Sequence, residues 1–179
     1  HYPVSNKISI VICLPAPEQF ELLFRLPQFG RGSTLFVNGR TIVENDSGFF
    51  AVNRSWKDGD TVEIHADLSI QLLKDSDILP EAVTRSVRYG ALLRGPIVLA
   101  LDTRANPSGI DDAIDLKSES ISAEPVANFT EFPVTQAYVV HSERRDHIFV
   151  DYASSGKIWK DDSATAAWFQ IRSFREDFH

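Results

Sequence analysis

Apolar and polar residues alternate along short runs through most of this chain. A period of two is typical of strands that bury one face. We therefore predict strands over residues 8–12, 20–26, 35–37, 41–43, 50–52, 62–66, 69–73, 87–93, 97–101, 134–141, 147–152 and 165–171. No stretch shows a helical period of 3.6 over a useful length, and we expect at most one short helical turn, within residues 77–85.

Turn residues punctuate these runs. Asn38-Gly39 is the strongest hairpin signal, Gly59 supplies a tight turn, and Pro27 ends a strand because proline has no N–H for the ladder. Many short strands with turn signals between them indicate a fold in which sheets pack face to face. The predicted class is all-β, an antiparallel β-sandwich of the jelly-roll kind with minimal helix.

The 179 residues are interpreted as one domain. Residues 1–102 carry most of the regular pattern, and residues 103–124 form a polar loop with one weak strand at 118–123. Residues 125–179 supply the completing strands, because about 50 residues would hardly make a separate core.

Composition excludes several classes of partner. The net charge is −7 with no basic patch, so neither nucleic acid nor an anionic membrane surface is an expected partner. No apolar run approaches the length of about 18 residues that a membrane span needs. Methionine is absent, and we expect His1 to be a processed or truncated start. We favour a secreted or periplasmic location over the cytoplasm.

The single cysteine, Cys13, cannot form an internal disulfide bond. It lies between Ile12 and Leu14 near the end of an apolar strand, and we expect a buried, inert thiol. A nucleophile or metal ligand needs partners that this neighbourhood lacks.

Six groups of residues, in one order along nearly the whole chain, resemble a known family. They are Tyr2-Pro3 with Lys7, residues 20–27 (FELLFRLP), 37–39 (VNG), 48–49 with 54–60 (GF and RSWKDGD), 93–98 (LRGPIV), and 150–156 (VDYASSG) with Trp159 and Trp168. The set is similar to the C-terminal β-sandwich domain that follows the helical barrel in the glycoside hydrolase family 127 group. This group is typified by β-L-arabinofuranosidases and was formerly a domain of unknown function.

The resemblance implies an ancillary role without catalysis. In that family a zinc-thiolate cysteine cluster with partner glutamates belongs to the helical barrel, and only Cys13 is present here. The implied partner is a helical-barrel catalytic domain of the same polypeptide, acting on arabinose-type or related plant glycans. Gln28-Phe29 and Leu93 depart from the family pattern, which indicates a divergent member.

Three pairs of carboxylates are candidate catalytic acids, because glycoside hydrolysis needs two such groups about 5 to 10 Å apart. They are Asp58 with Asp60, Asp111 with Asp112, and Asp161 with Asp162. The first pair is explained by its turn and the others by exposure in polar loops. We predict no catalytic residue in this chain.

Histidines are candidate metal ligands. Only His141 and His147 approach each other across a hairpin, with Asp146 as the one near third ligand. We expect exposed hairpin residues, no metal site and no cofactor in this chain.

Aromatic side chains are the remaining candidates, because sugars stack on the faces of tryptophan and tyrosine rings. We name Trp159, Trp56 and Tyr152 as substrate-binding candidates. Core packing is the alternative for Trp56 and the expected role of Trp168, whereas Trp159 lies among charged residues. Two other functions therefore stay open: a carbohydrate-binding module, and a structural module that forms a homodimer.

Overall fold

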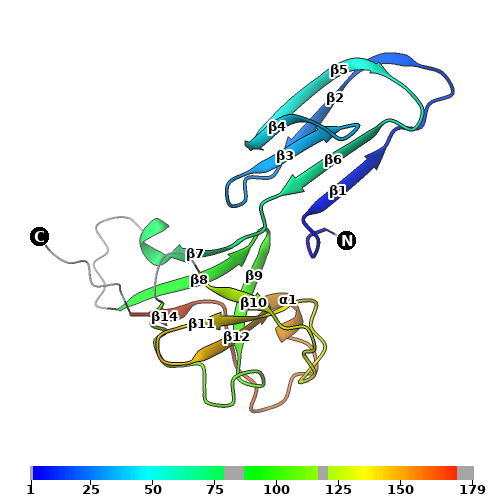
Figure 1. Ribbon diagram of the computed structural model, residues 1–179. Coiled ribbons are helices and arrows are strands. Elements are labelled where there is room, and N and C mark those ends of the chain that lie inside the picture. The colour runs from blue at the N-terminus through cyan, green and yellow to red at the C-terminus, as the bar shows by residue number, and fades with distance from the viewer. Residues whose placement is uncertain (1, 79–86, 117–120, 173–179) are drawn as a thin grey trace, which may run out of the picture. The chain divides into compact units, whose positions relative to one another are not determined.

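The computed structural model describes residues 2–78, 87–116 and 121–172 of the chain (Figure 1). The chain divides into two compact units, His1–Ser69 and Ile70–His179, here called the first and second units. Each is described by itself, and the predicted single domain over residues 1–179 stays a prediction. Among the described residues, no helix is long and apolar enough to cross a membrane.

The first unit consists of antiparallel strands in two sheets. One sheet has the order β1-β6-β3-β4 and the other pairs β2 with β5. The strands are β1 (Lys7–Val11), β2 (Glu18–Leu26), β3 (Ser33–Val37), β4 (Arg40–Asp46), β5 (Gly48–Trp56) and β6 (Thr61–Ala66).

Both sheets of the first unit contribute to one apolar core. Its buried members are Phe24, Leu26, Leu35, Val37, Trp56, Val62 and Ile64. Alternation places them there, because every second residue of a strand points to the same face. In β6, for example, Val62 and Ile64 are buried while Glu63 and His65 between them are only half-buried. The first unit is therefore a small sandwich of a four-stranded and a two-stranded sheet.

The turn between β3 and β4 is the predicted Asn-Gly hairpin. Asn38 and Gly39 have φ angles of +50° and +74°. Both lie in the left-handed region that a two-residue turn of this type requires. The Asn38 amide also donates to Asp60 Oδ1 at 2.8 Å, and its oxygen accepts the Thr61 N–H at 2.8 Å. The hairpin is thus tied to the start of β6.

The second unit is built on one antiparallel sheet in the order β10-β11-β12-β9-β8-β14, with β7 paired to β8 and β13 paired to β9. Its elements are β7 (Ile70–Lys74), η1 (Asp75–Asp77), β8 (Arg88–Arg94), β9 (Ile97–Asp102), β10 (Ala123–Pro125), β11 (Ala137–His141), β12 (Asp146–Asp151), α1 (Tyr152–Ser155), β13 (Thr165–Ala166) and β14 (Phe169–Ile171).

Both faces of this sheet are covered. The larger cluster of buried side chains comprises Leu92, Leu99, Leu101, Ile110, Ile114, Leu116, Val140, Phe149 and Phe169. A smaller cluster comprises Ala105, Phe132, Ala137 and Val150. Neighbouring residues of β12 show the division, since Phe149 joins the first cluster and Val150 the second. The loops after β9 and β10 supply the covering side chains.

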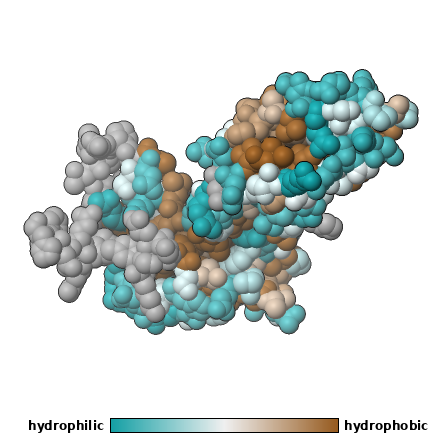
Figure 2. All heavy atoms as spheres, turned by 45° about the horizontal axis from the view of Figure 1, so that its top comes forward, coloured by the Kyte–Doolittle hydropathy of each residue, from teal (hydrophilic) through white to brown (hydrophobic). Residues whose placement is uncertain are grey.

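Apolar surface remains exposed on the outer face of the β2–β5 pair. Leu23 lies opposite Ala51, and Arg25 lies opposite Phe49. Leu23 is 63% exposed and Phe49 is 66% exposed. The space-filling view shows apolar surface on this unit (Figure 2).

The all-β class, the antiparallel sheets and the small amount of helix are confirmed. Among the described residues, helix is limited to η1 and the four-residue α1. The strand predicted over 147–152 ends at Asp151, because Tyr152 begins α1. The weak strand predicted at 118–123 falls partly on residues outside the described ranges, and β10 begins at Ala123. Most of the predicted turn within 77–85 also lies outside them.

Two residues that were predicted to be buried are exposed. Cys13 is exposed, because β1 ends at Val11 and the cysteine lies in the segment that follows it. Trp168 is 40% exposed, because it precedes β14 instead of lying within a strand.

Candidate functional site

Asp58 and Asp60 support the turn between β5 and β6. Asp58 Oδ1 accepts the Leu14 N–H at 3.1 Å, and Asp60 Oδ2 accepts the Lys57 N–H at 3.0 Å. The hydrogen bond from Asn38 is the main reason that the pKa of Asp60 lies below its usual value. Both carboxylates therefore have structural partners, in agreement with the interpretation made from the sequence.

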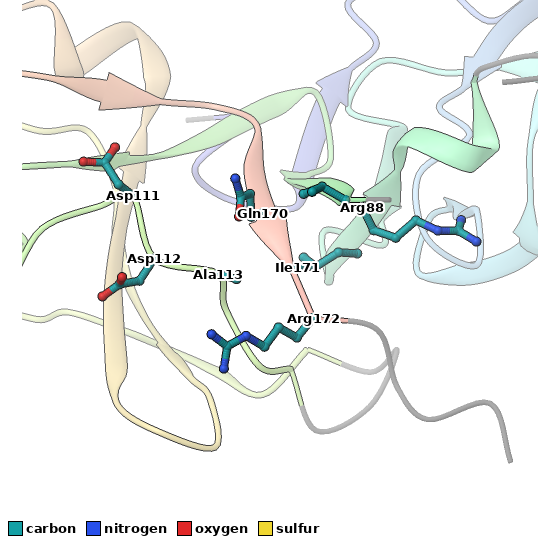
Figure 3. A pocket seen from close by; sticks show the side chains of 8 residues that line it. Arg88, Asp111, Asp112, Ala113, Gln170, Ile171 and Arg172 are labelled. Atoms are coloured by element: carbon teal, nitrogen blue, oxygen red, sulfur yellow. The ribbon is translucent and has the colours of Figure 1, made fainter. Parts of the chain in front are cut away.

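Asp111 and Asp112 line a surface pocket of about 510 Å³ in the second unit (Figure 3). Arg88, Gln170 and Arg172 also line it. Asp112 is exposed and lies 3.6 Å from the Arg145 guanidinium. The pocket thus mixes carboxylates with arginine side chains, whereas a glycosidase site needs a catalytic pair of carboxylates.

The histidines of the β11–β12 hairpin do not converge. His141 lies opposite Asp146 in the strand register, and its Nδ1 is 2.9 Å from Asp146 Oδ1. His147 lies opposite Val140 and is only 4% exposed, so the expectation of an exposed residue was wrong. Burial is the main cause that lowers the pKa of His147, with the Arg145 charge as the next cause.

No metal cluster was found within residues 2–78, 87–116 and 121–172. There, no three His, Cys, Asp or Glu side chains lie together in a way that could hold an ion.

Trp56 occupies the core of the first unit. It has no exposed surface, and its Nε1–H donates to the Phe20 carbonyl oxygen at 3.1 Å. The Arg54 guanidinium lies 5.1 Å from the ring centroid. The ring therefore has no face open to a sugar, and core packing explains this residue.

Tyr152 and Trp159, the other aromatic candidates, belong to one short segment of the second unit. Tyr152 begins α1 and is 53% exposed, and Trp159 follows the helix and is 49% exposed. Ile158 between them is also exposed. Residues 152–160 are called the α1 segment from here on, and the role of its aromatic residues in binding stays a prediction.

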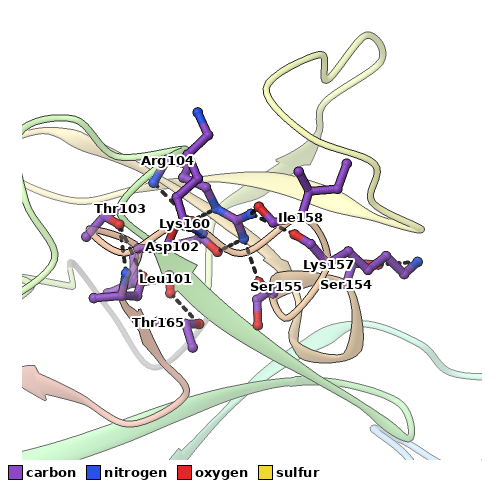
Figure 4. A network of polar contacts seen from close by, with 12 residues as sticks. Leu101, Asp102, Thr103, Arg104, Ser154, Ser155, Lys157, Ile158, Lys160 and Thr165 are labelled. Carbon is purple, nitrogen blue, oxygen red and sulfur yellow. Dashed lines mark hydrogen bonds and ion pairs between the residues drawn. The ribbon is translucent and has the colours of Figure 1, made fainter.

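A buried ion pair lies beneath this segment (Figure 4). Asp102, at the end of β9, has no exposed surface. Its Oδ1 accepts the Arg104 backbone N–H and Nε–H at 2.9 Å each, and its Oδ2 accepts Arg104 Nη2–H at 2.6 Å. The bond to Asp102 is the main reason that the pKa of Arg104 is raised. Such a forked pair fixes the guanidinium in one orientation.

The remaining N–H groups of Arg104 bind the α1 segment. Nη1 donates to the carbonyl oxygens of Lys157 and Ile158 at 2.7 and 3.0 Å, and Nη2 donates to the Ser155 carbonyl oxygen. The Ile158 backbone has a φ of +51°, which a β-branched residue rarely adopts. Arg104 thus holds the carbonyl groups on both sides of a strained residue.

Arg104 also lies against aromatic rings. Its guanidinium carbon is 3.8 Å from the Phe132 ring centroid and 5.7 Å from that of Trp159. Phe132 is buried, and the Arg104 side chain itself is 12% exposed. The arrangement links the exposed Trp159 to a buried, fully paired cation.

Sequence reasoning missed Asp102 and Arg104. A usable signal was present, because an aspartate directly follows the apolar run of 97–101 and an arginine lies two residues later. Charged side chains at the end of a buried strand need partners, because burying an unpaired charge costs free energy. Their partners in the α1 segment lie more than 50 positions away and have no local pattern.

Known proteins resemble this chain in sequence and in fold. Residues 1–68 match the family described as "Beta-L-arabinofuranosidase, GH127 middle domain". The resemblance predicted from the sequence is confirmed there, in the first unit, and the description places it in a middle domain of the family. No curated protein matches the chain.

Solved structures share the fold over both units. A GH127 β-L-arabinofuranosidase from Geobacillus stearothermophilus T6 has a TM-score of 0.72 and 16% identity, and the match covers 96% of this chain and 29% of that one. A structure described as a glycoside hydrolase has a TM-score of 0.72 and 22% identity, with 96% and 31% covered. A GH127 β-arabinofuranosidase has a TM-score of 0.58 and 15% identity, and the match covers 96% of this chain and 30% of that one. The chain therefore spans less than a third of each structure.

Proposed function

We propose that this chain is a non-catalytic ancillary β-sandwich part of a glycoside hydrolase related to family 127. It packs against a helical-barrel catalytic domain of the same polypeptide, which acts on arabinose-type or related plant glycans. The match of residues 1–68 to the middle domain of β-L-arabinofuranosidases is the observation that carries this proposal.

Its surface supports a packing role. Leu23 and Phe49 stand exposed on the outer face of the β2–β5 pair, with Ala51 beside them. Large apolar side chains that stand exposed next to one another are typical of a surface that another domain covers. The candidate carboxylates support the lack of a catalytic role, because Asp58 and Asp60 hold a turn and Asp112 lies near Arg145.

A glycosidase assay on the isolated chain tests the catalytic half of the proposal. We expect no turnover of an aryl β-L-arabinofuranoside, because the carboxylates that have partners serve the fold. Turnover at the rate of a working enzyme, about 1 per second or faster, would contradict it.

The coding sequence around these 179 codons tests the packing half. A helical barrel encoded in the same reading frame is the expected result, and stop codons on both sides would overturn it. A secreted or periplasmic location stays a prediction. The homodimer also stays a prediction, which sedimentation of the isolated chain at high concentration tests.

A further inference from the structure

The α1 segment combines exposed apolar side chains with a backbone that is firmly held. Ile158 and Trp159 are 64% and 49% exposed, so they contribute little to a core. The backbone that carries them is nevertheless held by the buried Arg104. Carbonyl groups in a surface loop could bind water instead, so this fixation is not needed to satisfy them. An exposed tryptophan on a fixed backbone is typical of a binding surface.

We propose that the α1 segment is a preformed glycan-binding platform, on which Trp159 stacks against a sugar ring and Arg104 holds the platform in shape. The proposal rests on the proposed function, because a domain of a glycoside hydrolase meets glycan chains. It deepens that function by assigning the contact to the second unit, beyond residues 1–68 that match the family.

The buried Asp102–Arg104 pair serves shape more than stability. Desolvation of two charges offsets most of their attraction, so such a pair often contributes little net free energy. Here, however, the paired guanidinium uses its other N–H groups to fix the Ser155, Lys157 and Ile158 carbonyls. Ordering the loop in advance removes an entropy cost from ligand binding. Arg104 is therefore a positioning residue, and Trp159 is the residue that contacts the glycan.

The groups near Trp159 suit a neutral sugar. Lys157 and Lys160 lie on either side of it in the sequence, and Asp161 follows. The Lys157 ammonium group donates to Ser154 Oγ at 3.3 Å. Lys160 can donate and Asp161 can accept hydrogen bonds, and a sugar hydroxyl group is itself a donor and an acceptor. Tyr152 adds a second exposed ring with a hydroxyl group. The ligand class is therefore a neutral polysaccharide, with sugars presented by their rings and hydroxyl groups.

Affinity gel electrophoresis of the complete 179-residue chain tests this proposal. Soluble arabinan, xylan and acidic pectin are cast in separate gels, and retardation relative to a glycan-free gel is measured. We expect arabinan or xylan to retard the chain. No retardation by either neutral polymer would overturn the proposal, and retardation by pectin alone would overturn the choice of a neutral ligand.

Two tryptophan variants locate the contact. Trp159→Ala is expected to weaken binding by about tenfold or more, because the stacking surface is removed. Trp168→Ala is the matched control, since Trp168 is also exposed but lies before β14. We expect it to bind like the unaltered chain. Unchanged binding by Trp159→Ala, or equal loss in both variants, would overturn the platform.

Arg104→Lys tests positioning separately from stacking. A lysine keeps the charge but cannot reach the same set of acceptors with one ammonium group. We expect weaker glycan binding although Trp159 is present, together with a shifted Trp159 indole N–H resonance in the NMR spectrum of the free chain. The Trp168 resonance should stay in place and report that the second unit, which carries Arg104, is folded. Full affinity with an unshifted Trp159 resonance would contradict the role of Arg104.

The glycan experiment and the glycosidase assay fail independently. Absent binding with absent turnover removes the platform and leaves the ancillary function standing. Turnover by the isolated chain removes the ancillary function, whatever the gels show.

Discussion

Buried polar side chains distinguish the two units of this chain. In the described part of the first unit, Ser33 is the one buried residue with a polar side chain. In the second unit the set is much larger: Asp75, Asp102, Asn106, Gln136, Ser142, His147, Asp151, Ser154 and Ser155. The two units share the same class of sheet, so the strands do not explain this difference.

The connections between strands do explain it. Tight turns such as Asn38-Gly39 join strands of the first unit and leave few backbone groups to be satisfied. The second unit instead covers its sheet with long loops, whose buried N–H and C=O groups need partners. Asn106 is one such partner, since its side chain donates to the Ile148 carbonyl at 2.8 Å and accepts the Ile148 N–H at 2.9 Å.

Asp151 performs a similar task at the end of β12. One carboxylate oxygen accepts the N–H groups of Thr135 and Gln136, at 2.9 and 3.0 Å. The other caps α1 by accepting the Ser154 N–H at 3.0 Å. The comparison teaches that the first unit depends on apolar burial, whereas the second also depends on a few irreplaceable polar contacts.

The largest expected effect is the loss of such a polar contact in the second unit. Asp102→Ala leaves the Arg104 guanidinium without its carboxylate in a buried place, and we expect a loss of about 3–5 kcal/mol in the free energy of unfolding. Chemical denaturation followed by circular dichroism measures it. Lys7→Ala is the control, because the Lys7–Glu63 pair of the first unit is in contact with solvent, and we expect a much smaller loss of stability. Equal effects would erase the distinction between the units.

The next effect tests apolar burial in the first unit. Leu35 is fully buried between the sheets, and Leu35→Ala should cost about 2–5 kcal/mol through lost contacts and a cavity. Leu23→Ala makes the same chemical change on the exposed face of β2 and should stay within about 0.5 kcal/mol. A large loss for Leu23→Ala would show that its face is covered in the isolated chain.

Two glycines give a smaller effect with opposite signs. A methyl group at Gly39 or at Gly156 meets no atom within 4 Å, so only the backbone decides. Gly39 has a φ of +74°, and Gly39→Ala should cost about 1–2 kcal/mol. Gly156 has a φ of −76°, and Gly156→Ala should stabilise the chain by about 0.4–1 kcal/mol by restricting the unfolded state. Thermal denaturation distinguishes the two variants. A shift of both midpoints in the same direction would contradict the opposite signs expected here.

The sequence predicted the first unit better than the second, for the same physical reason. A strand with one buried face has a period of two, and the turn at Asn38-Gly39 has a local signature. Trp56 was named as a substrate-binding candidate with core packing as the alternative, and the structure buries it completely. The prediction that Cys13 is buried was wrong, because the strand ends at Val11, two positions earlier, and no residue type marks that end.

In the second unit the decisive contacts join residues far apart in the sequence. His147 is polar and lies beside a turn, so local reasoning places it outside, yet it is buried. Arg104 donates to the carbonyl groups of Ser155 and Lys157, which lie 51 and 53 positions away in the sequence. Tyr152 and Trp159 were named from their residue types alone, while the network that fixes their segment has no period to reveal it.

The smallest expected effect is a difference in pH response between the units. Burial holds the pKa of His147 below its usual value of about 6.5, so at mildly acidic pH the unfolded chain binds a proton that the folded chain does not. The stability of the second unit is therefore fully present above about pH 6.5 and declines as the pH falls below it. In the first unit the pKa of Asp60 is lowered from about 3.8, so its contribution declines only when the pH falls below that value.

Urea denaturation at about pH 7.5 and about pH 5.5 separates these windows. The unaltered chain should be less stable at the lower pH, and His147→Gln should reduce that difference because the titrating group is gone. Asp60→Asn is the control, since Asp60 stays ionised at both pH values, and it should leave the difference unchanged. An undiminished pH dependence in His147→Gln would show that another group, and not the buried histidine, makes the second unit sensitive to acid.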